Sequence, residues 1–193
     1  METFTKDGTG GGYLAEVTES NMLKTESVSI KEISYESQRH GDAFVLNSGF
    51  ISLTTTGAFN AIMYVKNTDT ENKALFIEKL RVCGGLCAGA STMQVLLEAN
   101  PTGGTLISDQ TPGLSASANI SSSREFGGLV YIGGDGKTVS GGFQLSNFQG
   151  HAPGHSIQEY EGALILSKND SISIKLNPSV AMDVCIEIVC YHK

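Results

Sequence analysis

The sequence lacks tryptophan and has few charged residues, which occupy 17% of its 193 positions against about 25% in an average globular domain. Lysine and arginine number 13, aspartate and glutamate number 20, and the formal net charge is −7. A negative field of this size repels phosphate backbones and anionic lipid headgroups. We therefore expect neither nucleic acid nor a membrane surface as a partner.

The sequence also has little that would direct it into or through a membrane. Its first eight residues contain neither a cationic region nor an apolar core typical of a secretory signal. No run approaches the ~18 consecutive apolar residues of a spanning helix. We expect a protein that is made in a cytosol and stays soluble there.

Cysteines are few, and their spacing is not that of a metal or redox motif. Cys83 and Cys87 form one local pair, and Cys185 and Cys190 form another. Neither pair has the Cys-x-x-Cys spacing of a zinc knuckle or a thioredoxin-type site. Because a free cysteine behaves as a small hydrophobic residue, all four are predicted to be buried thiols. A chain of this length needs no disulfide or metal to build a core.

Glycine is abundant, at 23 residues, where an average frequency of ~7% would give about 14. From residue 28 onward, short apolar runs of alternating character are separated by turn residues, which predicts strands that include 93–98, 126–132, 142–148 and 183–191. No segment of ten or more residues carries an apolar stripe with a 3.6-residue period, so helices are predicted to be absent or single-turn. The pattern favours an all-β antiparallel sandwich of jelly-roll type.

The predicted organisation is an N-terminal arm over residues 1–26 and one sandwich domain over residues 27–193. The arm is polar, and its few apolar anchors are Leu14, Val17, Met22 and Leu23. Near the other end, alternating residues on both sides of the turn at 167–170 predict a hairpin.

The best catalytic candidates are His151 and His155 with Glu159, which superficially resemble the metal ligands of cupins. Cupins place two histidines at i and i+2, whereas i and i+4 on a strand lie about 13 Å apart. A metal site would need a turn at Pro153 to bring the two imidazoles together, and a cupin-like metalloenzyme remains a remote alternative. Glu159 and Glu161 alternate as acids of a solvated face do, rather than as a glycosidase pair.

Other catalytic patterns receive no support. The sequence has no Gly-x-Ser-x-Gly elbow. Residues 133–137, Gly-Gly-Asp-Gly-Lys, lack the full phosphate-loop form and the helix that should follow it, so they predict a hairpin turn. We assign no catalytic residue, no metal and no cofactor, and expect a protein that is not an enzyme.

Several segments together resemble a group of tailed-phage virion proteins. In the arm these are Asp7-Gly8-Thr9-Gly10, followed by residues 15–17, 21–23 and 27–28; in the body they are 61–67, 75–80, 92–98, 100–107 and 162–174. The resemblance covers most of the chain and implies a structural protein of jelly-roll type, without inherited catalytic residues.

The resemblance does not by itself say where in the particle the protein sits. A compact sandwich with a polar N-terminal arm, an acidic net charge and no active site favours a capsid decoration, or cement, protein on the surface of the virion head, assembled in the host cytoplasm. The expected partners are two further copies of the chain, in a homotrimer, and the major capsid protein. Flexible arms of this composition can order when they dock, so we expect the arm to hold the capsid through its four apolar anchors.

The alternative is a tail spike, tail or head-fibre component whose jelly roll binds a host surface glycan. Such a site needs exposed aromatic rings beside acids or amides. The candidate rings are Tyr131, Phe143, Phe148 and Tyr160. Fold alone does not choose between these functions, because jelly rolls carry all of them.

Overall fold

The computed structural model describes residues 4–6, 14–16, 32–84, 90–98, 100–101, 115–117, 123–151 and 155–193. The chain divides into two compact units, Met1–Lys31 and Glu32–Lys193. In the first unit, strand β1 (Phe4–Lys6) pairs antiparallel with β2 (Leu14–Glu16). The division falls five residues after the predicted end of the arm at residue 26.

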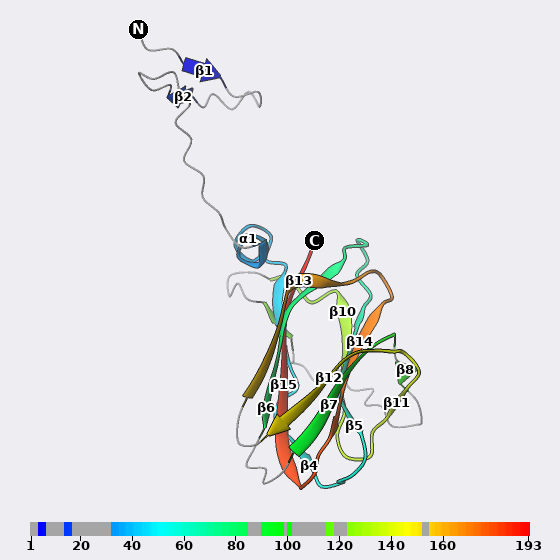
Figure 1. Ribbon diagram of the computed structural model, residues 1–193. Helices are drawn as coiled ribbons and strands as arrows, with labels where there is room; N and C mark the ends of the chain where they lie inside the picture. The colour runs from blue at the N-terminus through cyan, green and yellow to red at the C-terminus, as the bar shows by residue number, and fades with distance from the viewer. Residues whose placement is uncertain are drawn as a thin grey trace. The chain divides into compact units, whose positions relative to one another are not determined.

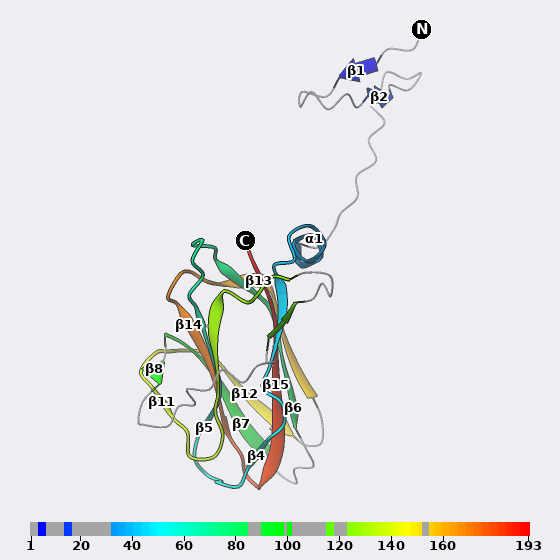
Figure 2. The same cartoon turned by 180° about the vertical axis from the view of Figure 1, so that it is seen from behind.

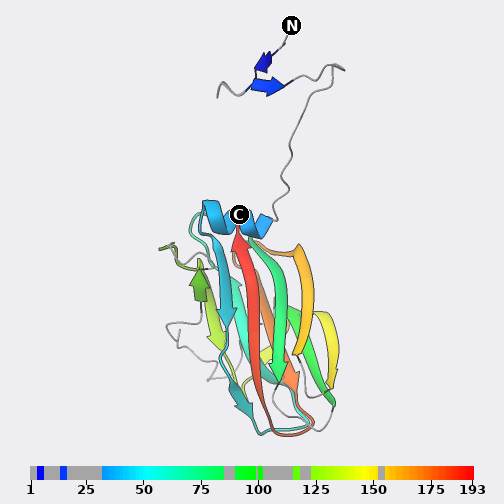
Figure 3. The same cartoon turned by 90° about the vertical axis from the view of Figure 1, so that its left-hand side faces the viewer.

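The second unit is an antiparallel β-sandwich with one short helix among its described residues. Figures 1 and 2 show the two sheets stacked against each other, and Figure 3 turns the six-stranded sheet toward the viewer. The elements are α1 (Glu32–Arg39), β3 (Ala43–Asn47), β4 (Ile51–Leu53), β5 (Asn60–Asn67), β6 (Leu75–Gly84), β7 (Ala90–Leu97), β8 (Asn100–Pro101), β9 (Ser115–Ser117), β10 (Gly128–Ile132), β11 (Val139–Ser140), β12 (Phe143–His151), β13 (His155–Leu166), β14 (Ser171–Asn177) and β15 (Met182–His192).

The strand order confirms the predicted all-β sandwich and gives it jelly-roll topology. One sheet has the order β10-β5-β14-β7-β12, and the other has the order β13-β6-β15-β3-β9, with β4 also pairing with β15. Eight long strands make two four-stranded halves, β3-β15-β6-β13 and β5-β14-β7-β12. In each of these four-stranded sets, strands from the second half of the chain (β12 to β15) pair antiparallel with strands from the first half (β3 to β7). This is the arrangement of a jelly roll.

The alternating pattern of the sequence decides which side chains fill the space between the sheets. On β15, Val184, Ile186 and Ile188 are fully buried, whereas Cys185, Glu187 and Val189 face outward and are half-buried. The predicted strands at 93–98, 126–132, 142–148 and 183–191 overlap β7, β10, β12 and β15. Period-two alternation was therefore a sound guide to strands and to their inner faces.

The predicted hairpin around residues 167–170 is wrong, although the turn itself exists. The Asp170 amide donates to the Ser167 carbonyl at 3.0 Å. However, β13 before the turn pairs with β6, and β14 after it pairs with β5 and β7. The turn carries the chain from one sheet to the other, because in this topology consecutive strands mostly belong to opposite sheets.

The turn at residues 133–137 also joins strands that do not pair with each other, since β10 pairs with β5 and β11 pairs with β8. Gly133 and Gly134 donate their amides to the carbonyls of Ile62 and Ala61. A Cβ at Gly133 would lie 1.7 Å from the Ala61 carbonyl oxygen, so this close approach requires glycine.

The expectation that helices are absent or single-turn is wrong for α1, which has eight residues and contacts β3 and β15. Its end is well defined. The amides of His40, Gly41 and Asp42 all donate to the Glu36 carbonyl, and Gly41 has the left-handed φ of 71° that favours glycine after a helix. The helix is too short for a sequence period to reveal it, but its terminal glycine was a usable signal.

Asn67, the last residue of β5, holds the β5–β6 loop in place. It is fully buried, and its side-chain nitrogen donates to the carbonyls of Lys73 and Leu166, each at 2.9 Å. Its side-chain oxygen accepts the Asp69 amide at 3.1 Å. One side chain therefore fixes the β5–β6 loop against the end of β13.

Candidate functional site

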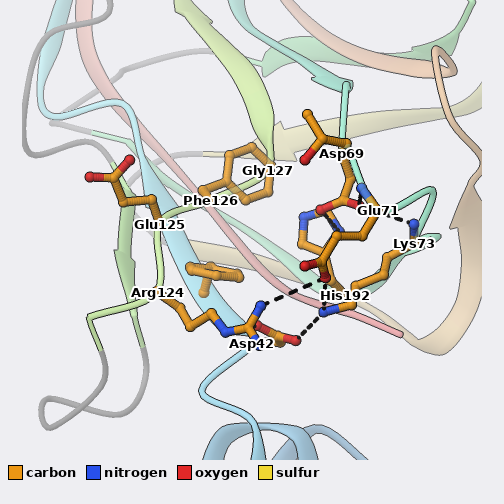
Figure 4. Close-up of a pocket in the computed structure, with 11 residues that line it drawn as sticks. Asp42, Asp69, Glu71, Lys73, Arg124, Glu125, Phe126, Gly127 and His192 are labelled. Carbon is orange, nitrogen blue, oxygen red and sulfur yellow. Dashed lines mark hydrogen bonds and ion pairs between the residues drawn. The ribbon is translucent and has the colours of Figure 1, made fainter.

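A polar pocket of about 260 Å³ opens where the β5–β6 loop, the segment before β10 and the ends of β3 and β15 meet (Figure 4). Turn residues position its loop wall. The Asp69 carboxylate accepts the amides of Glu71 and Lys73 at 2.8 and 3.1 Å, and Asn72 adopts a positive φ. The lining residues are Asp42, Phe44, Asp69, Thr70, Glu71, Lys73, Arg124, Glu125, Phe126, Gly127 and His192.

An ion-pair network connects three of the elements around the pocket. Lys73 Nζ lies 2.8 Å from Asp42 Oδ2 and 2.9 Å from Glu71 Oε2. Arg124 reaches the same two carboxylates at 3.5 and 3.8 Å. Hydrogen bonds to Asp42 and Glu71 raise the pKa of Lys73, which keeps it charged. With Asp69 and Glu125, the lining holds four carboxylates and two cationic side chains, a formal charge of −2 while His192 is neutral.

His192 is the most unusual residue of the pocket. It is 2% exposed, and neither ring nitrogen has a hydrogen-bond partner. The ring lies 5.9 Å from that of Phe44 and 5.4 Å from that of Phe126, between centroids. Asp69 Oδ2 lies 3.9 Å from Nδ1. Burial lowers the pKa of His192, although Asp69 and Asp42 act to raise it, so the imidazole is neutral near pH 7.

The pocket combines groups that bind a small polar molecule. The His192 ring lines the cavity, but its two unpaired nitrogens are buried. The carboxylates accept hydrogen bonds, the two cations donate them, and the phenylalanine rings supply apolar contact. Among the described residues, no three His, Cys, Asp or Glu side chains gather as metal ligands would.

Sequence reasoning did not find this site. Asp42, Lys73, Arg124 and His192 are scattered over 150 positions and form no motif. The turn residues at 67–72, Asn-Thr-Asp-Thr-Glu-Asn, are the one local signal for this site, and they indicate a turn without a function. Only the meeting of β15 with the loops at this end brings the charges together.

The four aromatic residues predicted for a glycan site do not form one cluster, because Tyr131 lies at the opposite edge of its sheet from Phe143 and Phe148. Tyr131 lies on β10 and packs against Tyr64, with ring centroids 5.7 Å apart. Phe143 and Phe148 lie on β12, at the opposite edge of the same five-stranded sheet; for Phe148 the structure describes the backbone only. Tyr160 lies on β13 in the other sheet, and burial raises the pKa of its hydroxyl.

Of the predicted arm anchors, Leu14 lies on β2, where only the backbone is described. The others, Val17, Met22 and Leu23, lie outside the described residues.

The predicted histidine and glutamate candidates do not assemble into a described site. His151 ends β12 and His155 begins β13, in different sheets, and the side chains of both are outside the description. Glu159 and Glu161 are exposed, as expected of a solvated face. Their alternation is broken, because the β13 register shifts between Glu159 and Leu164 and Glu161 has a φ of 51°.

The cysteines correct the expectation of four buried thiols. Cys190 is buried, but Cys83 is exposed and Cys185 is half-buried, while Cys87 lies outside the described residues. The register places Cys83 of β6 directly opposite Cys185 of β15. Cys83 and Cys185, which lie opposite each other in the structure, therefore belong to different local pairs in the sequence.

Exposed apolar side chains concentrate along two strands. Phe143 and Leu145 on β12 are exposed, as are Ile157 and Ile165 on β13. We call these four residues the β12–β13 edge, because each strand is outermost in its sheet among the described residues. The two strands lie on the same side of the sandwich, since Ser146 of β12 contacts Tyr160 of β13 (Figure 3).

Comparison with models of known protein families, with curated proteins and with solved structures finds no match to this chain. No helix in the described part of the chain is long and apolar enough to cross a lipid bilayer.

Proposed function

We propose that the chain is a non-enzymatic structural protein of a phage particle, a capsid decoration protein on the surface of the head. In this proposal it trimerises and stabilises the shell by bridging major capsid proteins. Two observations support it. The segments that resemble phage virion proteins are spread from residue 7 to residue 174, and those at 61–67, 75–80, 92–98 and 162–174 belong to a jelly roll with an apolar edge.

The β12–β13 edge is the observation that carries the proposal. Phe143 is 75% exposed, and Leu145 is the extra residue at the register shift between Gln144 and Ser146. Edge strands with exposed apolar side chains invite pairing with another chain. A closed three-fold assembly buries one such edge per copy and leaves none open to continued growth.

The N-terminal unit has the role of an attachment arm in this proposal. Its candidate anchors for the major capsid protein are Leu14, Val17, Met22 and Leu23. The chain is assembled in the host cytoplasm and resides on the capsid surface. It needs no cofactor, nucleic acid or membrane.

The first experiment tests trimerisation through the edge. Light scattering should give a trimer for the wild type and a monomer for the double variant Phe143→Gln, Ile157→Gln, because the variant adds polar groups that the interface would bury. Phe50→Gln is the matched control, because Phe50 is 79% exposed but lies between β3 and β4. A monomeric wild type, or a double variant that stays trimeric, contradicts this use of the edge.

The second experiment tests attachment to the capsid. Wild-type protein should co-sediment with undecorated shells in numbers that match three-fold or quasi-three-fold positions. Removal of residues 1–26 should leave a folded trimer that no longer co-sediments. Unchanged attachment of the shortened chain would contradict the role of the arm.

The pocket supports a second candidate function, glycan binding by a tail spike, tail or head-fibre component. Its favourable feature is a lining in which four carboxylates and the cationic side chains of Lys73 and Arg124 lie beside the rings of Phe44 and Phe126. Hydroxyl groups of a sugar can serve all of these donors and acceptors, and aromatic rings pack against sugar rings.

Host-surface oligosaccharides test this second candidate. A ligand present at about 100 times its Kd adds about 2.7 kcal/mol to the free energy of unfolding, which is a rise in Tm of about 5–10 °C for a domain of this size. Arg124→Ala should abolish the shift, whereas Phe143→Gln should keep it. No shift with any host glycan, or a shift that Arg124→Ala leaves intact, contradicts a sugar site in this pocket.

A further inference from the structure

Two thiols face each other across central strands of the six-stranded sheet. Cys83 is the last but one residue of β6, and Cys185 is its Cα partner on β15. The register between them is regular, with Gly84 opposite Val184 and Val82 opposite Ile186. We propose that Cys83 and Cys185 form an intramolecular disulfide when the protein meets a small disulfide oxidant such as glutathione disulfide.

The backbone already provides the spacing that a disulfide needs. Directly opposite residues of an antiparallel pair have Cα atoms about 4.5–5.5 Å apart, inside the roughly 4.4–6.8 Å observed across disulfides. Their Cβ atoms lie about 4.5–5.5 Å apart, so an approach of about 1 Å reaches the usual disulfide range. Because β6 ends at Gly84, the adjustment falls at the end of a strand.

Both thiols lie on the outer face of the sheet. The neighbours of Cys185 along β15, Val184 and Ile186, are fully buried between the sheets, so Cys185 points outward. Cys83 is exposed, and the ion pair between Arg81 and Glu187 occupies the next outward position along the same two strands. The pair is therefore open to a dissolved oxidant and is not sealed in the core.

A disulfide between Cys185 and Cys190 is excluded, because both residues lie on the extended strand β15. Five residues of extended chain span about 17 Å, and Cys190 is fully buried on the opposite face. Burial also raises the pKa of the Cys190 thiol, which removes it from thiolate chemistry. Cys87 is the remaining competitor for Cys83, and the experiment below separates the two pairings.

The exchange proceeds in two balanced steps. The exposed Cys83 thiolate attacks one sulfur of glutathione disulfide, the sulfur–sulfur bond breaks, and one glutathione thiolate leaves. The Cys185 thiolate then attacks the Cys83 sulfur of this mixed disulfide and expels the second glutathione. The two protein thiols are oxidised, glutathione disulfide is reduced to two glutathione thiols, and the protons of the cysteines pass to them.

The surroundings of Cys185 suit it to the second, resolving step. Burial raises the pKa of Cys185, and its thiol donates to Asn47 Oδ1 at 3.4 Å. Cys185 is therefore mostly protonated near neutral pH, and the more exposed Cys83 reacts first. The second step accelerates as pH rises, because more of Cys185 becomes the reactive thiolate. The finished bond closes a loop of roughly 100 residues, which should raise the Tm by about 5–15 °C.

The full-length protein is the test material, incubated with glutathione disulfide under native conditions. Thiols are then counted after denaturation, and the bonded peptides are identified by mass spectrometry. Wild type should fall from four free thiols to two and yield a peptide that joins Cys83 to Cys185. Cys87→Ser is the matched control and should fall from three free thiols to one, with the same Cys83–Cys185 peptide.

Cys185→Ser and Cys185→Ala should stop at a glutathione adduct on Cys83, with no internal bond and no rise in Tm. Cys83→Ser should form neither the bond nor that adduct. A bond between Cys83 and Cys87 in the wild type, or four free thiols after prolonged incubation, would overturn the proposal. The result is independent of capsid attachment and of glycan binding, because none of the variants alters the β12–β13 edge or the pocket.

Discussion

Replacing His192 by phenylalanine tests the central feature of the pocket. The wild-type imidazole is buried between Phe44 and Phe126 with two unpaired nitrogens, and a buried polar atom without a partner costs about 1–3 kcal/mol. Phenylalanine has a similar shape and no polar atoms. We expect His192→Phe to be at least as stable as the wild type near neutral pH.

The free energies of unfolding of the wild type and of His192→Phe should diverge as pH falls. Burial lowers the pKa of His192 below its ordinary value of 6.5, with Asp69 and Asp42 acting in the opposite direction. Between the folded-state pKa and 6.5, unfolding takes up a proton, so the wild type loses stability as pH decreases through this window. The loss approaches about 1.4 kcal/mol for each pH unit. His192→Phe lacks this group and should lose that part of the slope.

Urea unfolding followed by circular dichroism, from about pH 7.5 to about pH 5, measures both slopes. Other acid-sensitive groups are common to the two proteins and cancel in the difference. His40→Phe, at an exposed histidine, controls for the change of residue type, and His192→Leu repeats the test if the larger ring packs badly. Parallel curves for wild type and His192→Phe below pH 6.5 would refute a neutral, buried His192.

Asn67→Ala should lower the free energy of unfolding by about 2–4 kcal/mol, because it leaves the buried Leu166 carbonyl and the partly buried Lys73 carbonyl without their donor. Asn147→Ala, at an exposed position of β12, should change it little. Gly162→Ala should cost about 1–3 kcal/mol more than Gly57→Ala in the same urea assay. Both glycines have φ near 75°, but a Cβ at Gly162 would lie 2.7 Å from the Tyr191 hydroxyl, whereas Gly57 has open space. Asp135→Ala should speed hydrogen exchange at the amides of Thr54 and Thr55, because both donate hydrogen bonds to the Asp135 carboxylate. An unchanged exchange rate would contradict these hydrogen bonds.

The strands and their inner faces could be predicted because each depends on neighbouring residues. Alternation along 183–191 sets Val184, Ile186 and Ile188 on one side of an extended chain, and that side is buried wherever the strand packs. Turn residues such as those at 167–170 likewise act locally through backbone conformation and short side-chain hydrogen bonds. The all-β sandwich follows from these local preferences.

The partners of each strand and the site were decided only by the tertiary structure. The same turn at 167–170 would suit a hairpin or a crossing between sheets. The choice depends on β6, whose residues lie about 70 to 90 positions before their partners on β13 in the sequence. Cys83 meets Cys185, and His192 meets Asp42 and Asp69, only because β15 enters between β6 and β3. Contacts between distant residues depend on the packing of the whole core, so the spacing of residues along one sequence does not predict them.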